Sequence, residues 1–334
     1  MTIDNSLDSL SDDRRKAAQT ALAATFGTTP IDALAPIGGG ASSAMIFRVT
    51  VRGRGYLLRL EGEPSPLRNP QQYAAMRIAA DAGIAPAIHF IDETSRVAIM
   101  DLVEQQPVQD YPGGPRRLAQ ALGALLARLQ DVPAFPTFVD YPDIVSRLFA
   151  HVRRTGLFAP GLLDPHVERL EEIRHAYSAG TTRLVASHND FNPRNVLYDG
   201  RRLWLIDWES AYLNDPLVDA AIAVDSFGFP PGLDDVLVQA CLGRRLDTGT
   251  LARLTVVRAL TRLYFAGVFL SASAVAWKAD PDGDLSVPTL AQFRQAVHDG
   301  SLAPGAPRTR HVLGKMYLES FMTGTTPPDF GVAI

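Results

Sequence analysis

The stretch from Ser187 to Glu209 carries the residue types that phosphoryl-transfer chemistry needs. Asp190 and Asn195 lie five residues apart in a polar segment, and Asp207 follows a later apolar run. A carboxylate can orient the hydroxyl that attacks a phosphoryl group, while carboxylate and amide oxygens are typical ligands of magnesium. The pattern therefore predicts Asp190 as the group that holds the acceptor hydroxyl, with Asn195 and Asp207 as metal ligands.

A tight turn is expected to bring the two candidate metal ligands together. Asp199-Gly200 separates the short apolar runs at 196–198 and 203–205, which is the pattern of a two-residue β-hairpin. Because a hairpin returns the chain to the end where it began, Asn195 and Asp207 should lie close to each other. An isolated Asp-x-x-x-x-Asn pattern is commonly an Asx turn, so the functional interpretation depends on the combination of loop and hairpin.

His188, just before this loop, has two interpretations. It can hold the loop by bonding to backbone carbonyls, or it can transfer a proton itself, and we favour the structural role. The other six histidines show no metal-ligand spacing.

The first third of the chain has the pattern of a small antiparallel sheet with one helix. An N-terminal helix is expected over residues 8–26, with Ser11 as its N-cap. Strand patterns occur at 31–37, 44–51, 56–60, 87–91 and 96–103, and a helical pattern occurs at 70–82. We therefore predict an N-terminal helical extension over residues 1–30 and a small lobe over residues 31–104.

The chain beyond residue 104 is mainly helical in pattern. A polar, proline-containing linker precedes an amphipathic stretch at 116–130. Further helices are expected at 142–155, 161–178, 215–225, 231–243, 249–275, 288–298 and 306–323. The strand signals of this part, at 184–187, 196–198 and 203–206, lie in or beside the polar loop. Residues 105–334 should form a larger, mainly helical lobe, so the fold class is α+β.

A glycine-rich turn in the small lobe is a candidate phosphate cover. Gly39, Gly40, Ser42 and Ser43 lie between two predicted strands, where their backbone N–H groups could contact phosphates. The turn lacks the Gly-Lys-Ser/Thr ending of a P-loop. The alternative is an ordinary hairpin turn that binds nothing.

Arg59 is the candidate cation for the nucleotide phosphates. It interrupts an apolar strand, and its guanidinium suits bidentate contact with phosphate. Between residues 17 and 277 a phosphate-binding cation must be Arg or His, because lysine occurs only at Lys16, Lys278 and Lys315. The alternative is a solvated position on an edge strand.

The run that ends the small lobe suits a hinge whose backbone groups pair with adenine. Its candidate nucleotide-binding residues are Met100, Asp101 and Val103. The alternative is a simple buried strand.

Composition restricts the class of partner. The 334-residue chain has a net charge of −4 and lacks the basic character of a nucleic-acid-binding protein. Its single cysteine, Cys241, excludes a disulfide framework and a cysteine metal site. The acidic N-terminal sequence is not a signal peptide, and the apolar run near Leu263–Trp277 contains serines and is short for a membrane span. We expect a cytoplasmic protein with a small-molecule substrate, without nucleic-acid or membrane partners.

Three motifs carry a resemblance to a known family. They are HNDFNPRN at 188–195, LIDWE at 205–209 and NDPLVDAA at 214–221. In this order they resemble the aminoglycoside phosphotransferase and choline/ethanolamine kinase superfamily, over about residues 32–225. The resemblance implies a protein-kinase-like, two-lobed fold that binds ATP and magnesium between its lobes.

The resemblance also implies roles for single residues. By position, Asp190 would be the catalytic base, and Asn195 and Asp207 would be metal ligands. Arg59 would occupy the position of the small-lobe cation, and Asp219 would brace the catalytic loop as a structural residue.

Two positions depart from the family pattern. The helix after Arg59 usually offers a glutamate to pair with the cation, and the nearest equivalent here is Gln72. A Leu-His pair that often ends the long helix of the second lobe is Leu129-Gln130 in this chain. The first departure leaves room for a nucleotide-binding regulatory pseudokinase.

The acceptor is expected to be a small cationic metabolite. The DWE and NDP forms of the motifs lean toward the choline/ethanolamine kinase branch, and a quaternary ammonium needs aromatic faces and a nearby carboxylate. At helical spacing such aromatic residues also serve as core. The candidates are Trp208, Tyr212, Tyr264 and Trp277, with Glu209 or Asp215 as the acid. The leading hypothesis is an ATP- and magnesium-dependent kinase acting on a choline- or ethanolamine-like hydroxyl; the alternatives are an aminoglycoside-type or sugar kinase and the pseudokinase.

Overall fold

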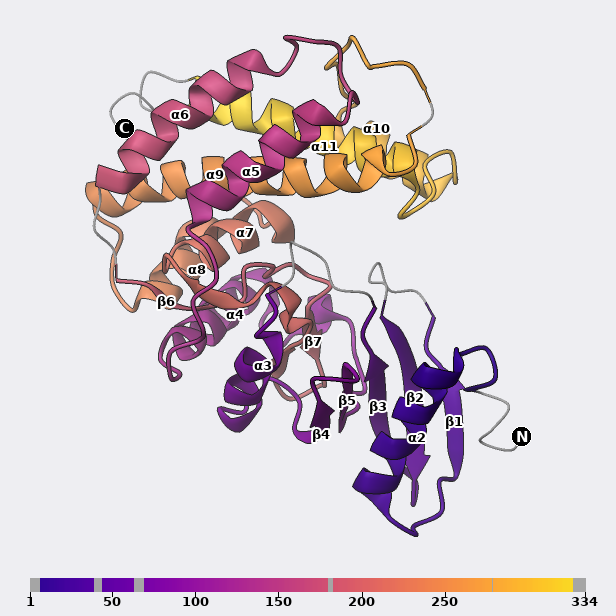
Figure 1. Cartoon of the computed structure of the whole chain (residues 1–334). Helices are drawn as coiled ribbons and strands as arrows, with labels where there is room; N and C mark the ends of the chain where they lie inside the picture. The colour runs from indigo at the N-terminus through magenta and orange to yellow at the C-terminus, as the bar shows by residue number, and fades with distance from the viewer. Residues whose placement is uncertain (1–6, 39–43, 63–68, 180–182, 278, 327–334) are drawn as a thin grey trace. The chain divides into compact units, whose positions relative to one another are not determined.

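The computed structural model describes residues 7–38, 44–62, 69–179, 183–277 and 279–326. Strands dominate the first part of the chain and helices the rest, which confirms the predicted α+β class (Figure 1). The chain divides into two compact units. The first comprises Met1–Thr137, Val185–Leu213 and Ser226–Gly243, and the second comprises Phe138–Leu184, Asn214–Asp225 and Arg244–Ile334.

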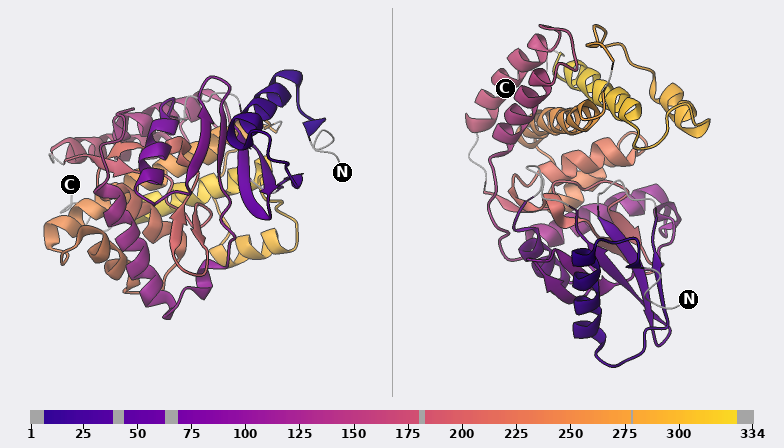
Figure 2. Two further views of the ribbon diagram at one scale, coloured as in Figure 1. Left: turned by 90° about the horizontal axis from the view of Figure 1, so that it is seen from below. Right: turned by 45° about the vertical axis from the view of Figure 1, so that its right-hand side comes forward.

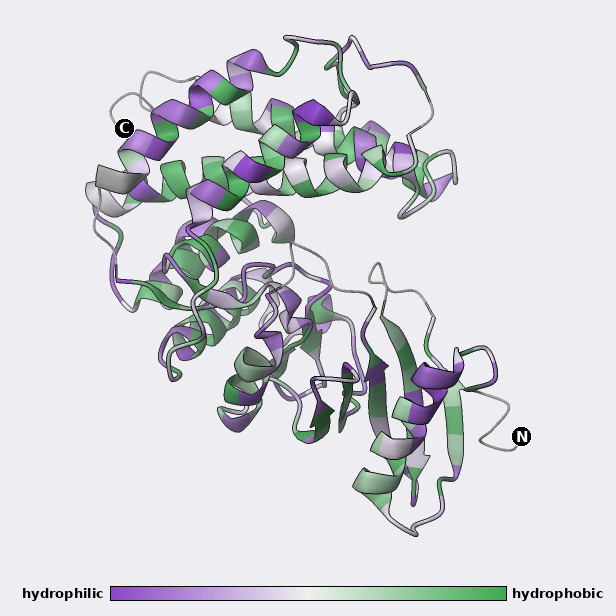
Figure 3. Ribbon diagram, in the orientation of Figure 1, coloured by the Kyte–Doolittle hydropathy of each residue, from purple (hydrophilic) through white to green (hydrophobic). Residues whose placement is uncertain are grey.

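A five-stranded antiparallel sheet belongs to the first unit. Its order is β1-β2-β3-β5-β4, and β2 and β3 are largely apolar (Figure 3). The strands are β1 (Ala33–Pro36), β2 (Met45–Val51), β3 (Arg54–Leu60), β4 (Ile88–Asp92) and β5 (Val97–Asp101). Arg59 lies opposite Ile46 of β2 and Ala98 of β5. β3 is thus an interior strand, so the alternative of an edge position for Arg59 is wrong.

Two helices accompany the sheet. α2 (Asp12–Phe26) runs along it and buries Ala18, Ala21 and Leu22 in one core with β3 and β5 (Figures 1 and 2). The helix starts later than residue 8 because residues 8–10 form a turn, closed by a bond from Leu10 N to Leu7 O. α3 (Gln72–Asp81) lies within the predicted helical stretch.

The hairpin predicted around Asp199-Gly200 is confirmed, although four residues, 199–202, connect its strands instead of two. β7 (Val196–Tyr198) pairs with β8 (Leu203–Leu205), and Val196 lies opposite Leu205. The turn needs glycine because Gly200 has φ +88°, in the left-handed region. The adjacent short sheet joins β6 (Val185–Ser187) to β9 (Tyr212–Asn214), a strand that the sequence pattern did not indicate, and the 3₁₀ turn η2 (Trp208–Ser210) precedes β9.

Helices α4 (Gly114–Gln130) and α8 (Leu233–Leu242) pack closely in the same unit, after the 3₁₀ turn η1 (Val108–Asp110). The contact is made at Gly123, where a Cβ atom would lie 2.3 Å from the backbone oxygen of Leu237 and 2.6 Å from Cβ of Ala240. α4 also contacts β6, the strand before the polar loop, and β8, the second strand of the hairpin that follows the loop. This helix pair therefore supports the segment that carries the candidate catalytic residues.

The second unit is helical in its described part. Its elements are α5 (Tyr141–Arg154), α6 (Asp164–Ala179), most of α7 (Val218–Phe227), α9 (Thr248–Ala274), α10 (Leu290–His298) and α11 (Pro307–Thr325). α9 packs against α5, α6 and α11. By length and composition alone α9 could span a membrane, with a mean hydropathy of 1.3 over its most apolar stretch, but 61% of that stretch is buried, as in a core helix.

We predict that Gly123→Ala destabilises the protein. Alanine favours a helix over glycine by up to about 1 kcal/mol, but here its methyl group would push α4 away from the α8 backbone at a net cost of about 1–3 kcal/mol. The free energy of unfolding from urea titration measures the effect. Ala124→Gln, at the exposed neighbouring position, is the matched control and should change little. An unchanged stability for Gly123→Ala would contradict the close packing.

Candidate active site

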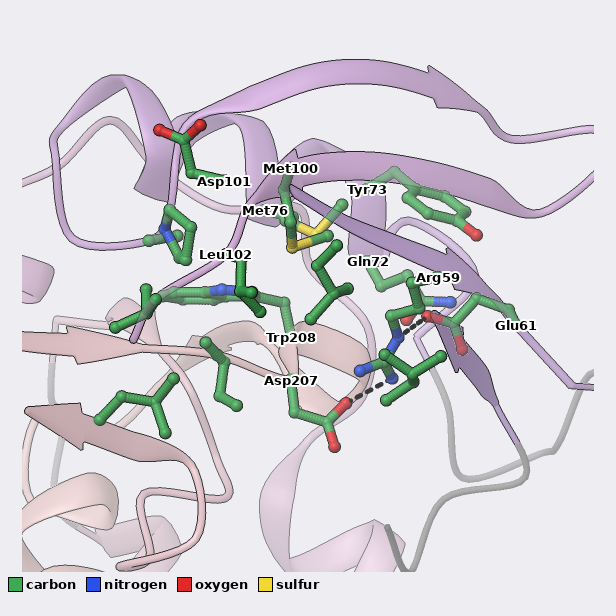
Figure 4. Close-up of a pocket in the computed structure, with 17 residues that line it drawn as sticks. Arg59, Glu61, Gln72, Tyr73, Met76, Met100, Asp101, Leu102, Asp207 and Trp208 are labelled. Carbon is green, nitrogen blue, oxygen red and sulfur yellow. Dashed lines mark hydrogen bonds and ion pairs between the residues drawn. The ribbon is translucent and has the colours of Figure 1, made fainter. Parts of the chain in front are cut away.

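A pocket in the first unit is lined by the sheet and by the β7–β8 hairpin (Figure 4). Its volume is about 100 Å³. The proposed hinge residues Met100, Asp101 and Val103 line it together with Arg59 and Asp207. Its apolar walls would suit a purine ring, and they include Leu57, Met76, Ala85, Leu197 and Ile206.

The segment that ends β5 presents backbone rather than side chain to a ligand. Asp101 Oδ1 lies 2.6 Å from Arg54 Nη2 and 2.8 Å from His89 Nε2, so its carboxylate is already engaged. Within the described part of the chain, no group accepts a hydrogen bond from the Val103 backbone N–H. A free backbone donor at this place is what pairing with an adenine edge requires. The nucleotide role of Met100, Asp101 and Val103 stays a prediction.

Gly39, Gly40, Ser42 and Ser43 lie outside the described residues, and their role as phosphate cover stays a prediction.

The Arg59 guanidinium lies between two carboxylates (Figure 4). Its Nε is 2.5 Å from Glu61 Oε1 and its Nη2 is 2.7 Å from Asp207 Oδ1, while its side chain is 11% exposed. Burial alone would lower the pKa of Arg59, but Asp207 and Glu61 raise it above its ordinary value. The cation therefore keeps its charge and its position at the pocket wall.

Glu61 supplies the acid that the helix lacks. The resemblance led us to expect a partner for Arg59 on α3, where Gln72 stands instead of glutamate. Gln72 lines the pocket, but the acid bound to Arg59 comes from the end of β3 itself, two residues further on. The cation therefore has a counter-ion even though α3 provides none.

Asp190 is held by two amide groups of its own loop. Its Oδ1 accepts a bond from Asn192 Nδ2 at 2.8 Å and its Oδ2 accepts one from Asn195 Nδ2 at 2.7 Å. Burial raises the pKa of Asp190 to about 6, although the two asparagine bonds favour the charged form. A carboxylate with a pKa near neutrality, fixed in one orientation, suits the transfer of a proton from a hydroxyl.

Asn195 and Asp207 leave oxygen atoms for a metal ion. The bond from Ile206 N to Asn195 O, 3.0 Å long, places Asn195 beside the residue before Asp207. Asn195 uses only its Nδ2 in side-chain bonds and Asp207 uses Oδ1, so within the described residues Asn195 Oδ1 and Asp207 Oδ2 have no hydrogen-bond partner. A carboxylate and an amide oxygen fit magnesium, which binds through few protein ligands and retains water. The metal role of both residues stays a prediction.

Two further polar residues fix the backbone around Asp190. His188 Nε2 lies 2.9 Å from the Ile206 carbonyl oxygen, and Asn189 Nδ2 donates to the Ser210 carbonyl oxygen at 2.9 Å. Asn189 has φ +61°, a left-handed conformation that asparagine tolerates. Burial lowers the pKa of His188 to about 4, partly offset by its bond to Ile206 and by the charge of Asp207. The neutral ring fits the structural role that we favoured.

The acceptor candidates of the first unit are mostly core residues. Trp208 is 4% exposed, and its ring lies 4.8 Å from His188 and 6.0 Å from Phe135. Tyr212 is also buried. Glu209 is half-buried, with Oε2 3.9 Å from Arg59 Nη2, and it is the candidate acid that remains near the pocket. Trp208 also lines the pocket, and the substrate role of Trp208 and Tyr212 stays a prediction.

The candidates of the second unit have partners of their own. Asp215 is fully buried and binds Arg253 at 2.5 Å, so its charge is neutralised and does not offer a free carboxylate to a cation. The Trp277 ring stacks on His311 at 4.3 Å, and the Tyr264 ring lies 5.6 Å from Tyr141. Asp219 is buried in the first turn of α7, and its role as a brace of the catalytic loop stays a prediction.

Two residues of the site, and one aromatic residue packed beside its loop, were missed in the sequence. Glu61 looked like the end of an ordinary strand, although an acid two residues from a strand cation could have suggested a pair. Asn192 was not distinguished from other polar loop residues. Phe227, whose ring lies 6.2 Å from Phe191 and 5.8 Å from Phe229, is the last residue of α7 and carries no motif.

We predict that the free energy of unfolding of His188→Gln falls less steeply at acid pH than that of the native protein. The unfolded chain takes up a proton at His188 near pH 6.5, but the native chain does so only near pH 4, so native stability falls as pH drops between these values. At pH 4.5 the loss from this residue is about 2–3 kcal/mol relative to pH 7. Glutamine retains an N–H donor for Ile206 and does not titrate. Urea unfolding at pH 7, 5.5 and 4.5 measures the difference, and identical pH dependence in both proteins would contradict the buried neutral ring.

Sequence comparison identifies the family. A model described as the phosphotransferase enzyme family matches residues 33–254. Over 56 residues the chain is 40% identical to Protein LicA of Haemophilus influenzae, a match that covers 17% of this chain. It spans only 21% of that relative's length.

Solved structures show the same kinase-like fold. A choline/ethanolamine kinase family protein from Mesorhizobium loti superposes with a TM-score of 0.68 at 20% identity, covering 96% of this chain and 97% of that one. A Plasmodium vivax ethanolamine kinase gives a TM-score of 0.65 at 12% identity, covering 94% and 88%. The structure of LicA in complex with AMP superposes with a TM-score of 0.60 at 12% identity, covering 93% of this chain and 100% of that one. Because the family model spans more than half of its length, the chain belongs to the phosphotransferase enzyme family, and its structural neighbours share the kinase-like fold.

Proposed function

We propose that the protein transfers the γ-phosphoryl group of ATP to the hydroxyl of a small cationic metabolite of the choline or ethanolamine type. The observation that carries this proposal is the arrangement around Asp190. Two asparagine amides hold its carboxylate, and one of them belongs to Asn195, which lies beside Asp207 at the mouth of the hairpin. A base and two oxygen ligands in one loop and hairpin are the parts that phosphoryl transfer needs.

The proposed reaction uses Asp190 as the base. The acceptor hydroxyl donates its proton to Asp190 while its oxygen bonds to the γ-phosphorus. The bond between the γ-phosphorus and the bridging oxygen breaks, and ADP leaves with that electron pair. Asn195 and Asp207 would hold magnesium, which neutralises phosphate charge when bound. Arg59 would contact the phosphates with its charged guanidinium.

The nucleotide side supports an active enzyme over a pseudokinase. The doubt came from Gln72, which replaces a helix glutamate. Since Glu61 binds Arg59 directly, the cation is held without that glutamate. The three residues that the chemistry requires, Asp190, Asn195 and Asp207, are all present. The AMP bound to LicA concerns that protein and supports ATP here only by family likeness.

The acceptor side is supported by aromatic residues beside the catalytic loop. Phe191 follows Asp190 and is fully buried, and Phe227 lies against it with a ring separation of 6.2 Å. Phe229 stacks on Phe227 at 5.8 Å with an interplanar angle of 7°. The Phe227 and Phe229 side chains are half-buried, so part of each ring face can contact a ligand. Aromatic faces attract quaternary ammonium groups, and we propose Phe227 and Phe229 as acceptor contacts.

We predict that Asp190→Ala abolishes turnover and leaves nucleotide binding nearly intact. Loss of a positioned base lowers kcat by about 10²- to 10⁴-fold. Coupled detection of ADP measures turnover, and calorimetric titration measures the affinity for ATP. Asn192→Ala should lower kcat by less than Asp190→Ala does, because it removes only one of the two hydrogen bonds that orient Asp190. If Asp190→Ala loses ATP affinity instead, the residue acts in binding and its assignment as base is wrong.

Phe227→Leu should raise the KM for choline and leave the KM for ATP unchanged. Leucine retains apolar volume but lacks the aromatic face, and a cation–π contact is worth about 0.5–2 kcal/mol, or roughly 2- to 30-fold in affinity. Phe227→Tyr is the matched control and should retain the native KM. The uncharged isostere 3,3-dimethylbutanol should not distinguish Phe227→Leu from the native protein. Equal losses for choline and the isostere would contradict recognition of a cation at this ring.

A further inference from the structure

We propose that Arg14, in the N-terminal helix α2, is a positioning residue for the nucleotide site. It fixes the end of β3, where Glu61 sets the guanidinium of Arg59. This inference rests on the proposed function, because it assumes that Arg59 contacts the phosphates of ATP.

The Arg14 guanidinium ties together two segments of the sheet. Nη1 donates to the Ser95 carbonyl oxygen at 2.7 Å, in the turn between β4 and β5, and Nη2 donates to the Glu61 carbonyl oxygen. Hydrogen bonds from a charged donor are stronger than bonds between neutral groups. Arg14 therefore links Glu61 to the turn that contains Ser95. Glu61 is also the residue whose side chain binds Arg59.

Glu61 is in turn held closely on both its backbone and its side chain. Its N–H donates to the Arg96 carbonyl oxygen at 2.9 Å, and its carboxylate, only 6% exposed, contacts Arg59 Nε. β3 ends at Leu60, so Glu61 is the first residue after the strand. A small shift of the Glu61 backbone would displace its carboxylate and with it the guanidinium of Arg59.

Helix α3 does not supply the acid that pairs with Arg59. In protein kinases the acid that pairs with the small-lobe cation lies on a helix, so movement of that helix controls the pair. The first turn of α3 contains no acidic residue, and Gln72 and Tyr73 line the pocket instead. The position of Arg59 therefore depends on β3 and on the groups that hold the end of β3.

α2 can hold β3 because it is anchored in the core. Ala18, Ala21 and Leu22 are buried with Leu58 and Leu60 of β3 in one apolar cluster. This packing sets where the first turn of α2 places Arg14. α2 also lies before residue 33, where the family match begins. The brace is therefore supplied by a segment outside the family model.

Calorimetric titration of ATP and of adenosine, both without magnesium, tests the inference. Arg14→Met should weaken ATP binding about tenfold, as expected for a coupled contact, and leave adenosine binding unchanged because adenosine lacks phosphates. Arg14→Lys should recover part of the loss by donating to one of the two carbonyls. Lys16→Met, an exposed cation on the same helix, is the matched control and should bind both ligands like the native protein.

A double variant separates positioning from general destabilisation. If Arg14 acts through Glu61, Arg14→Met combined with Glu61→Gln should weaken ATP binding no more than Glu61→Gln alone. Equal loss of ATP and adenosine binding in Arg14→Met would show a merely structural role and overturn the inference.

Arg59→Met distinguishes failure of this inference from failure of the proposed function. If Arg59→Met weakens ATP binding and Arg14→Met does not, the brace is wrong and the proposed nucleotide site stands. If neither variant changes ATP binding, Arg59 does not contact phosphates, and both the brace and the proposed nucleotide arrangement are wrong.

Discussion

The nucleotide pocket depends on one guanidinium held between two carboxylates. Arg59 joins Glu61 of the sheet to Asp207 at the end of the hairpin, with little exposure to water. Removing either acid would leave a buried charge with fewer partners, which is far more costly than losing a surface ion pair. The pair also explains why an arginine is suitable here, because its planar fork binds two carboxylates at once. In the proposed function it would exchange one of them for phosphate oxygens.

The loop and hairpin supply the chemistry because their hydrogen bonds fix each polar group. Asn195 donates to Asp190 through its nitrogen and keeps its oxygen available, so a single amide couples the proposed base, Asp190, to the candidate metal site. His188 remains neutral and bonds to the backbone carbonyl that precedes Asp207. Partial desolvation places the pKa of Asp190 near neutrality without moving it beyond the range in which it accepts a proton.

The sequence pattern predicted the features of the fold that depend on residues close together in the chain. The Asp199-Gly200 hairpin, the strand that contains Arg59 and most helix positions are confirmed, because turn residues and apolar periodicity act over short distances. Partners from distant segments were not predictable. Asp215 looked like a free acid in the sequence, but Arg253, 38 residues later, pairs with it. The packing of Phe135 against Trp208 likewise joins segments that are far apart in the sequence. Glu61 was missed because the family pattern directed attention to the helix.

The most direct test of the account is ³¹P NMR of the native protein with ATP, magnesium and choline or ethanolamine. The account predicts a new phosphomonoester resonance that grows in equal amount with ADP and disappears when the amino alcohol is omitted. Formation of inorganic phosphate and ADP at the same rate with and without the amino alcohol, or unchanged ATP in every sample, would contradict it.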